Sequence, residues 1–287
     1  MTDSPRQGIL SVDNVHRVYG KAGRRATRQV HALKGVSFEV QAGEKFGIVG
    51  ESGSGKSTLI RLLAALDHPT SGHVTFEGQQ ISGRKERDLK ALRQKVQVVF
   101  QDPMSSLDPR MSVRAIVSEP LRGLGRREAE SRVREVLDSV GIPAAAMERY
   151  PHQFSGGQRQ RISIARALAP KPDLLIADEP VSALDVSVRA QILNLLEDLT
   201  RESGVTMVFV SHDLGVVRLV CDRVAVLNHG ELVELGATED VYANPQHDYT
   251  KALLAASPVL RFKPDNLMNV DSAVVSSAGL SVEERGQ

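Results

Sequence analysis

Residues 46–58 read Phe-Gly-Ile-Val-Gly-Glu-Ser-Gly-Ser-Gly-Lys-Ser-Thr, and the rest of the chain is organised around them. This stretch predicts a short buried strand, a glycine-rich turn and a helix that begins near Ser57. The spacing G-x-x-x-x-G-K-S from Gly50 to Ser57 is that of a phosphate-binding loop. Its glycines let several backbone N–H groups face one point, next to the positive end of a helix dipole. An ordinary glycine-rich turn is the alternative interpretation.

We therefore predict that the loop holds nucleotide phosphates, with Lys56 neutralising their charge and the Ser57 hydroxyl on Mg²⁺. The predicted nucleotide contacts of the loop are Gly50, Glu51, Ser52, Gly53, Ser54, Gly55, Lys56, Ser57 and Thr58.

The composition is that of a globular protein large enough to form its own core. Of 287 residues, 41% are hydrophobic and 25% are charged, which is ordinary for such a protein. The formal net charge of +1 gives no electrostatic footprint for nucleic acid. The single cysteine, Cys221, excludes an internal disulfide framework and a Cys₄ metal or iron–sulfur site. No apolar stretch reaches the roughly 18 to 20 residues that span a bilayer, so if the protein works at a membrane, another chain must do the spanning.

The order of apolar segments predicts a mixed α/β fold. Partly alternating residues at 9–18 and 33–40 favour two strands of an antiparallel β subdomain, joined by a basic loop at residues 21–28. Strands that alternate with helices favour a mainly parallel sheet with helices on both faces, here the core of a P-loop NTPase. Further strands are expected at residues 46–49, 73–76, 96–100, 174–177, 206–210 and 223–227, with residues 73–78 forming an edge hairpin. Helices are expected at residues 57–66, 89–94, 186–201 and 216–220, and the helix at 186–201 should face inward through Val188, Ile192, Leu195 and Leu199.

From residue 102 to about 168 the pattern changes to helices. Apolar residues at helical spacing share one face, and Gly141 with Pro143 ends the run. These residues are Ala129, Val133, Val136, Leu137 and Val140. We predict a helical subdomain at about 102–168, inserted into one ATPase domain at 8–258. Residues 259–287 have weak periodicity and form a tail, either a surface extension or a regulatory segment.

A second stretch of the chain adds carboxylates. The apolar strand at 174–177 delivers Asp178 and Glu179 to its C-terminal end. After a phosphate-binding loop, this pattern is a Walker B element, in which Asp178 holds Mg²⁺ and Glu179 polarises the attacking water. The alternative is an exposed Asp-Glu pair that only begins a loop.

Residues 154–161, Phe-Ser-Gly-Gly-Gln-Arg-Gln-Arg, predict a second anion site without a lysine. Ser155 would cap a helix whose first N–H groups are exposed by the two glycines. Here the sequence resembles the ABC transporter ATPases, whose hallmark is Leu-Ser-Gly-Gly-Gln; Phe154 replaces the leucine and keeps the position apolar. The resemblance extends from about Ile9 to Pro258, with the motifs in the family's order.

The resemblance implies roles for residues that the patterns alone leave open. Tyr19 matches the aromatic residue that stacks on adenine, Gln101 the glutamine that reaches Mg²⁺, and His212 the histidine that contacts the γ-phosphate. An ordinary aromatic residue at a strand end is the alternative for Tyr19. The loop at residues 182–185, ending at Asp185, matches the one that crosses between paired subunits. The other seven histidines are interpreted as surface or structural residues.

Pairing is a further implication of the resemblance: one subunit's phosphate loop and the other's signature segment, residues 155–158, enclose each ATP. The implied catalytic residues are Lys56, Gln101, Glu179 and His212. The implied metal ligands are Ser57, Gln101 and Asp178. Beyond the loop, the implied ATP contacts are Tyr19, Gln101, Ser155, Gly156, Gly157, Gln158, Asp178 and Asp185.

Three stretches resemble the oligopeptide, dipeptide and nickel importer ATPases: residues 100–111, residues 150–153, and residues 244–254, where Asp248 stands in place of the usual proline. This implies an ATP-hydrolysing importer subunit, for peptides or a related solute such as nickel chelates, on the cytoplasmic face of the membrane. The implied partners are a second ATPase subunit (the same chain or a homologue), two polytopic permeases and an extracytoplasmic solute-binding protein, with no nucleic acid. The alternatives are an exporter subunit, a soluble ABC ATPase acting on ribosomes or DNA, and a regulator that does not turn over.

Overall fold

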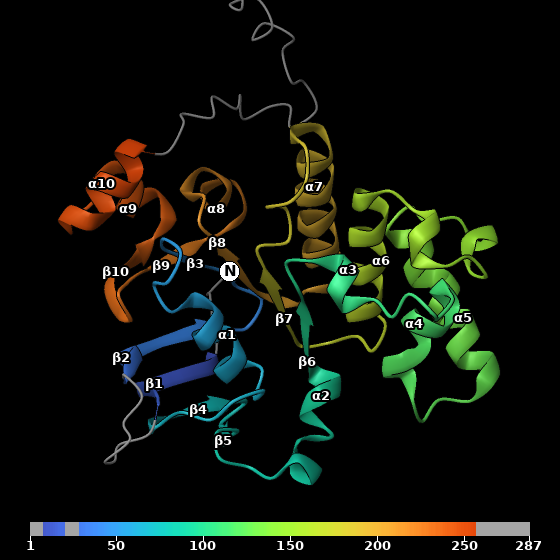
Figure 1. Cartoon of the computed structure of the whole chain (residues 1–287), viewed down its shortest axis with the longest axis horizontal. Coiled ribbons are helices and arrows are strands. Elements are labelled where there is room, and N and C mark those ends of the chain that lie inside the picture. Colours follow the sequence, from blue (N-terminus) through green and yellow to red (C-terminus); the bar gives the residue numbers. More distant parts are fainter. Residues whose placement is uncertain (1–7, 21–28, 257–287) are drawn as a thin grey trace, which may run out of the picture.

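The computed structural model in Figure 1 describes residues 8–20 and 29–256. The basic loop at 21–28 and the predicted tail at 259–287 lie outside the described residues. Within the described part, the strands form a four-stranded sheet in the order β2-β1-β4-β5 and a six-stranded sheet in the order β10-β9-β3-β8-β7-β6. The strands are β1 (Gly8–Tyr19), β2 (Val30–Gln41), β3 (Lys45–Val49), β4 (Ser71–Phe76), β5 (Gln79–Gln80), β6 (Val96–Val99), β7 (Leu174–Asp178), β8 (Thr206–Ser211), β9 (Arg223–Asn228) and β10 (Glu231–Ala237).

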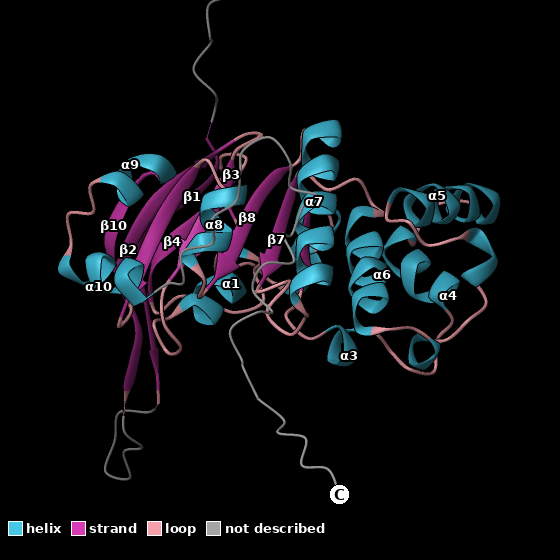
Figure 2. Cartoon of the chain, turned by 90° about the horizontal axis from the view of Figure 1, so that it is seen from above, coloured by secondary structure: helices cyan, strands magenta, loops and turns pink. Residues whose placement is uncertain are grey.

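The helices gather on the faces of the six-stranded sheet and in a separate group beside it (Figures 1 and 2). They are α1 (Lys56–Leu63), η1 (Glu86–Leu89), α2 (Leu92–Lys95), α3 (Pro103–Ser106), α4 (Val113–Ser118), η2 (Glu119–Leu121), α5 (Arg126–Ser139), η3 (Ala144–Ala146), η4 (Pro151–Gln153), α6 (Gly156–Leu168), α7 (Val186–Ser203), α8 (Leu214–Val220), α9 (Thr238–Ala243) and α10 (Asp248–Ala256), the η elements being single 3₁₀ turns. None of the helices in the described part is both long and apolar enough to cross a bilayer.

The six-stranded sheet is mainly parallel, as predicted. Strand β3 lies between β8 and β9 and runs parallel to both, and only β10 is antiparallel to its neighbour. In β7, Leu174 and Ile176 pack into the core shared with α1 and the four-stranded sheet, whereas Leu175 and Ala177 pack into the core shared with α6, α7 and α8. Both faces of the sheet are therefore covered, which explains its continuously apolar strands.

The four-stranded sheet is antiparallel, and it contains the predicted hairpin at its end. Glu77 and Gly78 form the two-residue turn between β4 and β5, both with positive φ (48° and 72°), the geometry of a type I′ turn. The edge strand is β5, however, because β4 also pairs with β1. Strand β10 was not predicted, although its half-exposed sequence is that of an edge strand.

Helix α1 ends at Leu63, three residues before the predicted end. Ala65 adopts a left-handed conformation (φ 51°), and the Leu66 N–H donates to the Arg61 carbonyl, the closing contact of a Schellman motif. Arg93 also donates to the carbonyl oxygen of Ala64 at 2.9 Å. The helix therefore ends earlier than its apolar pattern predicts, because the left-handed Ala65 and the contact with Arg93 stop it.

The segment predicted to be helical is built from α3, α4, α5 and α6. Helix α5 buries the expected face through Val133, Val136 and Leu137. The apolar face of α7 differs from the prediction: Val188, Leu195 and Leu199 are only half-buried, whereas Leu193 and Leu196 are buried with Ile192. The reason is that α7 packs against both the sheet and α6, so its apolar stripe is wider than one row of residues.

Candidate nucleotide-binding site

The loop between β3 and α1 has backbone conformations that only glycine accommodates. A methyl group added at Gly50 would lie 2.3 Å from the Leu227 carbonyl oxygen, and one at Gly55 2.7 Å from the Ala32 carbonyl oxygen. Gly55 also has a φ of 109°, which L-residues rarely adopt. The loop is therefore packed tightly against β2 and β9, and its last residue, Gly55, begins helix α1 by accepting the Leu59 N–H.

Lys56 lies inside this loop and is held by it. Its side chain is 8% exposed, and Nζ donates to the carbonyl oxygens of Gly50 at 2.6 Å and Glu51 at 3.0 Å. A Glu179 carboxylate oxygen lies 4.0 Å from Nζ. Burial lowers the pKa of Lys56, and the charges of Glu179 and Asp178 oppose that shift. The loop's own carbonyl oxygens thus hold the cation beneath the loop.

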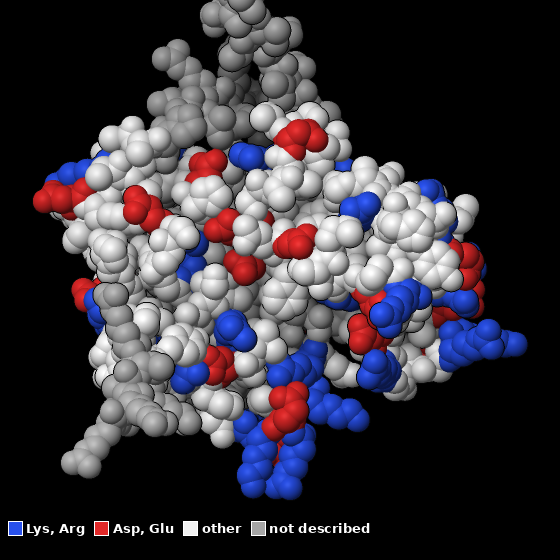
Figure 3. All heavy atoms as spheres, viewed as in Figure 1, with Lys and Arg blue, Asp and Glu red and all other residues white. Residues whose placement is uncertain are grey.

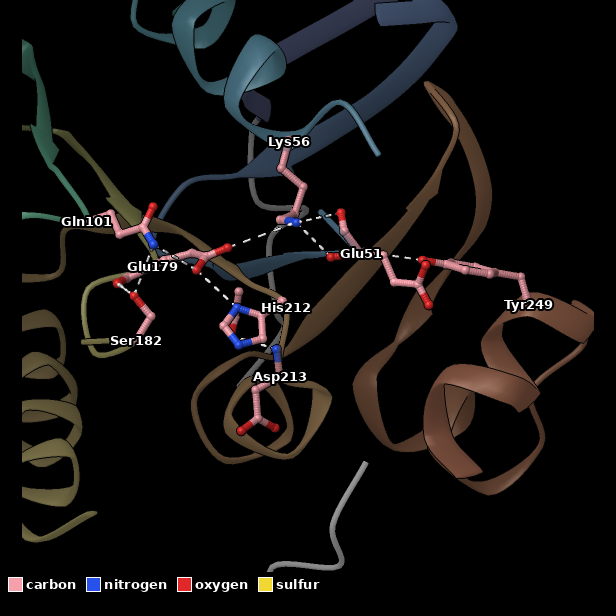
Figure 4. A network of polar contacts seen from close by, with 10 residues as sticks. Glu51, Lys56, Gln101, Glu179, Ser182, His212, Asp213 and Tyr249 are labelled. Atoms are coloured by element: carbon pink, nitrogen blue, oxygen red, sulfur yellow. Dashed lines mark hydrogen bonds and ion pairs between the residues drawn. The ribbon is translucent and has the colours of Figure 1, made fainter. Parts of the chain in front are cut away.

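Glu179 brings three separated segments together (Figure 4). It follows β7 with a φ of 43°, and its N–H donates to the Val210 carbonyl oxygen at 2.9 Å. A left-handed non-glycine residue costs of the order of 1 to 3 kcal/mol, and here it turns the carboxylate back toward the loop. Glu179 Oε2 lies 3.0 Å from Nδ1 of His212 and 3.3 Å from Nε2 of Gln101. Gln101 Nε2 is also 3.3 Å from the Ser182 hydroxyl.

Asp178 shows that the site is short of positive charge. Burial raises its pKa from 3.8 to about 6, the neighbouring Glu179 charge adds to the shift, and Lys56 opposes it. A second cation would favour the ionised form of Asp178. Ser57, Asp178 and Gln101 offer hydroxyl, carboxylate and amide oxygens, which are the donor types that Mg²⁺ takes. The residues present therefore fit a divalent cation.

An open cavity of about 940 Å³ joins these groups. The predicted catalytic residues Lys56, Gln101, Glu179 and His212 all line it, although they come from four different places in the sequence. The cavity is lined by Val30, His31, Ala32, Lys34, Glu51, Ser52, Gly53, Gly55, Lys56, Ser57, Thr58, Gln101, Glu179, His212 and His229.

Sequence reasoning missed part of this wall. His31 and His229, interpreted above as surface or structural residues, line the cavity together with Lys34. His229 directly follows β9, at the same edge of the sheet as His212. A polar residue directly after an apolar strand was therefore the sequence signal that could have identified it. His31 and Lys34 lie on β2, and nothing in the local pattern distinguishes them from other strand residues.

Tyr19 is not among the described residues that line the cavity. Its hydroxyl donates to Asp67 Oδ2 at 2.9 Å, and the Arg17 guanidinium lies 4.5 Å from the centre of its ring. Its ring is thus engaged with Arg17 and Asp67, and its contact with adenine stays a prediction.

The signature segment, residues 155–158, forms the predicted helix cap. Ser155 Oγ accepts the Gln158 N–H at 3.3 Å, and the Gln158 side chain accepts the Ser155 N–H at 3.0 Å, so the two residues form a capping box. Asp185 caps α7 in the same way through the Val188 N–H at 3.0 Å. Neither Asp185 nor any residue of the signature segment lines the cavity around Lys56 in the described part of the chain.

Comparison with known proteins adds family membership to this geometry. A family model described as "ABC transporter" matches residues 33–182, and one described as "Oligopeptide/dipeptide transporter, C-terminal region" matches residues 233–281. A putative peptide import ATP-binding protein of Brucella ovis is 48% identical over 261 residues, which are 90% of this chain and 80% of that protein. The oligopeptide transport ATP-binding protein AppF of Bacillus subtilis is 48% identical over 268 residues, which are 91% of this chain and 82% of that protein.

Solved structures agree with these matches. A dimeric post-hydrolysis structure of the ATP-binding cassette MJ0796, bound to ADP and phosphate, is 35% identical with a TM-score of 0.71, covering 80% of this chain and 98% of that chain. The cbiO1 protein of Clostridium perfringens, part of an ABC transporter complex, is 32% identical with a TM-score of 0.72, covering 83% of this chain and 91% of that chain. The phosphate loop, the carboxylate pair and these matches together show that the chain belongs to the ABC transporter family, as one of its ATP-binding, ATP-hydrolysing subunits.

Proposed function

We propose that this chain hydrolyses ATP to drive an importer for peptides or a chemically related solute such as a nickel chelate. The observation that carries the ATPase role is the convergence of Lys56, Gln101, Glu179 and His212 on one cavity. The peptide class is supported by the relatives named as peptide importer subunits and by the match at residues 233–281.

In the proposed mechanism, the loop N–H groups bind the phosphates of ATP and Lys56 exchanges its carbonyl partners for phosphate oxygens. Glu179 accepts a proton from, or orients, the attacking water, and His212 fixes the Glu179 carboxylate through the contact at 3.0 Å. Ser57, Asp178 and Gln101 would hold Mg²⁺, which supplies neutralisation of phosphate charge. Lys56 and the divalent cation would therefore stabilise the negative charge that develops on the γ-phosphate, whereas Glu179 acts on the water.

We assign the remaining half of the site to a second ATPase subunit, either another copy of this chain or a homologue. Ser155 and Gly156 are exposed and lie at the N-terminus of α6, where backbone N–H groups favour an anion. Because the signature segment does not line its own chain's cavity, it is suited to complete the cavity of a partner. We also assign residues 8–258 to one ATPase domain, with residues 102–168 inserted as a helical subdomain.

The proposed contact with membrane subunits rests on exposed apolar side chains. Phe100 and Met104 flank Gln101 and are 38% and 50% exposed, although large apolar side chains are usually buried. We propose that this surface contacts two polytopic permeases, which place the chain on the cytoplasmic face of the membrane. A solute-binding protein would deliver the solute from outside.

The alternative of a nucleic-acid partner has weaker support. Basic side chains gather on η1 and α2 (Figure 3), but the cluster is partly neutralised. Arg93 pairs with Glu86 at 3.1 Å, and Lys95 pairs with Glu77 at 2.6 Å.

The test is Glu179→Gln, which keeps the shape of the side chain and removes its charge. The variant should bind ATP, lose hydrolysis by about 100-fold or more, and accumulate as an ATP-bound dimer in size-exclusion chromatography. Hydrolysis at the wild-type rate would remove Glu179 from the mechanism.

Co-purification from the native membrane tests the transport role separately. Two polytopic membrane proteins and an extracytoplasmic binding protein would support import. Recovery with ribosomes or DNA, or with permeases of an exporter, would overturn it.

A further inference from the structure

The C-terminal helix α10 touches the phosphate loop through one hydroxyl group. The backbone N–H of Glu51 donates to the Tyr249 hydroxyl at 2.9 Å, across 198 positions of sequence (Figure 4). Tyr249 belongs to residues 244–254, the stretch whose sequence resembles the importer subgroup and for which no role in the site was predicted. This contact connects that segment to the centre of the nucleotide site.

The Glu51 N–H belongs to the same peptide plane as the Gly50 carbonyl, which accepts Lys56 Nζ at 2.6 Å. No peptide bond in the described part of the chain is cis, so this N–H and this carbonyl point in opposite directions from one rigid plane. One edge of the plane is therefore fixed by Tyr249 and the other holds the Lys56 ammonium. Rotation of this plane would move the anchor of the lysine.

Tyr249 is itself held by the strand that precedes it. The Glu234 carboxylate of β10 accepts the backbone N–H groups of Gln246 at 2.8 Å and His247 at 3.1 Å. His247 Nδ1 then accepts the Tyr249 N–H at 3.1 Å, and the tyrosine ring packs against the main core. Burial raises the pKa of the Tyr249 hydroxyl, so this group stays protonated at neutral pH. Contacts within the chain thus hold the hydroxyl in place.

We propose that Tyr249 is a positioning residue for ATP binding: it fixes the Gly50–Glu51 peptide plane, so that the C-terminal segment sets the affinity of the phosphate loop for ATP. This inference rests on the proposed ATPase function of the same site. Loss of the hydroxyl leaves the plane held only through the Gly50 carbonyl, so that it is less well ordered and ATP binding must order it further. The effect therefore falls on ATP binding and spares the hydrolytic step, whose groups are Glu179 and His212.

The test is Tyr249→Phe in the full-length chain, since the substitution keeps the ring and removes only the hydroxyl. The KM and the equilibrium Kd for ATP should rise about three- to tenfold, as expected for one hydrogen bond, while kcat stays within about twofold. Without nucleotide, hydrogen exchange at the Glu51 amide should become faster. Unchanged ATP affinity and unchanged exchange would overturn the proposal.

Tyr242→Phe is the matched control. Tyr242 lies in α9 and donates to the Leu214 carbonyl oxygen, so this variant also loses one tyrosine hydrogen bond without touching the phosphate loop. It should lower the melting temperature at least as much as Tyr249→Phe and leave the KM for ATP unchanged. An equal rise in KM in both variants would show a general loss of stability and would overturn the positioning role.

Glu234→Gln tests the route by which Tyr249 is held. Alone it should raise the KM for ATP less than Tyr249→Phe does, and in the Tyr249→Phe background it should add nothing, because both act through one contact. Additive effects would overturn that route. A wild-type chain that neither binds nor hydrolyses ATP would overturn the proposed function instead, while exchange at Glu51 still tests the contact itself.

Discussion

The phosphate loop and the signature segment are both glycine-rich helix N-termini, yet the side chains that surround them differ. Around the loop, Lys56 is nearly buried and the carboxylate of Glu179 lies 4.0 Å away, so the charges belong to one interconnected site. The signature segment carries no charge partner of this kind: Ser155 and Gln158 are exposed and bond to each other. The phosphate loop therefore lies beside the predicted catalytic side chains of its own chain, whereas the signature segment presents exposed N–H groups and the polar side chains of Ser155 and Gln158. In the proposed dimer, the signature segment of one subunit completes the cavity of the other.

Among the variants that test this difference between the two helix ends, Lys56→Ala should have the largest effect on ATP hydrolysis. We expect ATP hydrolysis to fall by about 100- to 1,000-fold, because the variant removes the cation that the loop places against the phosphates. A steady-state phosphate-release assay measures it.

The control is Lys34→Ala, which removes a lysine from the same cavity wall. Lys34 pairs at the surface with Glu231 at 3.1 Å, so its loss should change hydrolysis by less than about threefold. Equal losses in both variants would mean that the cavity needs positive charge in general and not the buried lysine.

A smaller effect is expected when each of the two glycines of the signature segment is replaced by alanine. A methyl group at Gly156 would meet only Leu184, at 3.7 Å, whereas one at Gly157 would lie 2.4 Å from Val188 Cγ1. Gly156→Ala should therefore keep the melting temperature within about 2 °C and lower hydrolysis about tenfold, since the methyl group stands before the exposed N–H groups. Gly157→Ala should destabilise the fold by about 1 to 2 kcal/mol through overpacking of α6 on α7. Thermal unfolding and hydrolysis assays on both variants decide this, and full activity of Gly156→Ala would contradict a role for that helix end in ATP binding.

The smallest expected effect concerns folding stability and the lack of positive charge near the Asp178 carboxylate. Its pKa is raised from 3.8 to about 6 in the folded chain, so between these pH values the folded state binds more protons than the unfolded state. Without Mg²⁺ and nucleotide, stability from this group is therefore present below pH 3.8 and is lost as pH rises to 6.

Asp178→Asn should then stabilise the nucleotide-free protein at pH 7.5 by about 1 kcal/mol, a figure reduced for the partial exposure of the carboxylate. Denaturant unfolding at pH 4 and pH 7.5 measures the difference, which should be much smaller at the lower pH. Destabilisation at pH 7.5 would contradict the charge shortage.

Much of the fold was predictable because its signals are local. The strand–loop–helix around Lys56, the apolar strand before Asp178 and the cap at Ser155 each follow from the order of neighbouring residues. The end of α1 was missed because Ala65 and the distant Arg93 terminate it. The strand β10 was missed because none of its residues is buried, so its apolar pattern is weak.

The sequence by itself determined which groups the chain possesses: a phosphate loop, a carboxylate pair and a second glycine-rich helix end, each fixed by backbone rules that act over a few residues. Only the tertiary structure decided which of these groups meet. The parallel sheet brings Gln101, Glu179 and His212 to one edge beside Lys56, and packing of α10 brings Tyr249 to Glu51. Such meetings depend on burial and strand order across the whole chain, which no local pattern encodes.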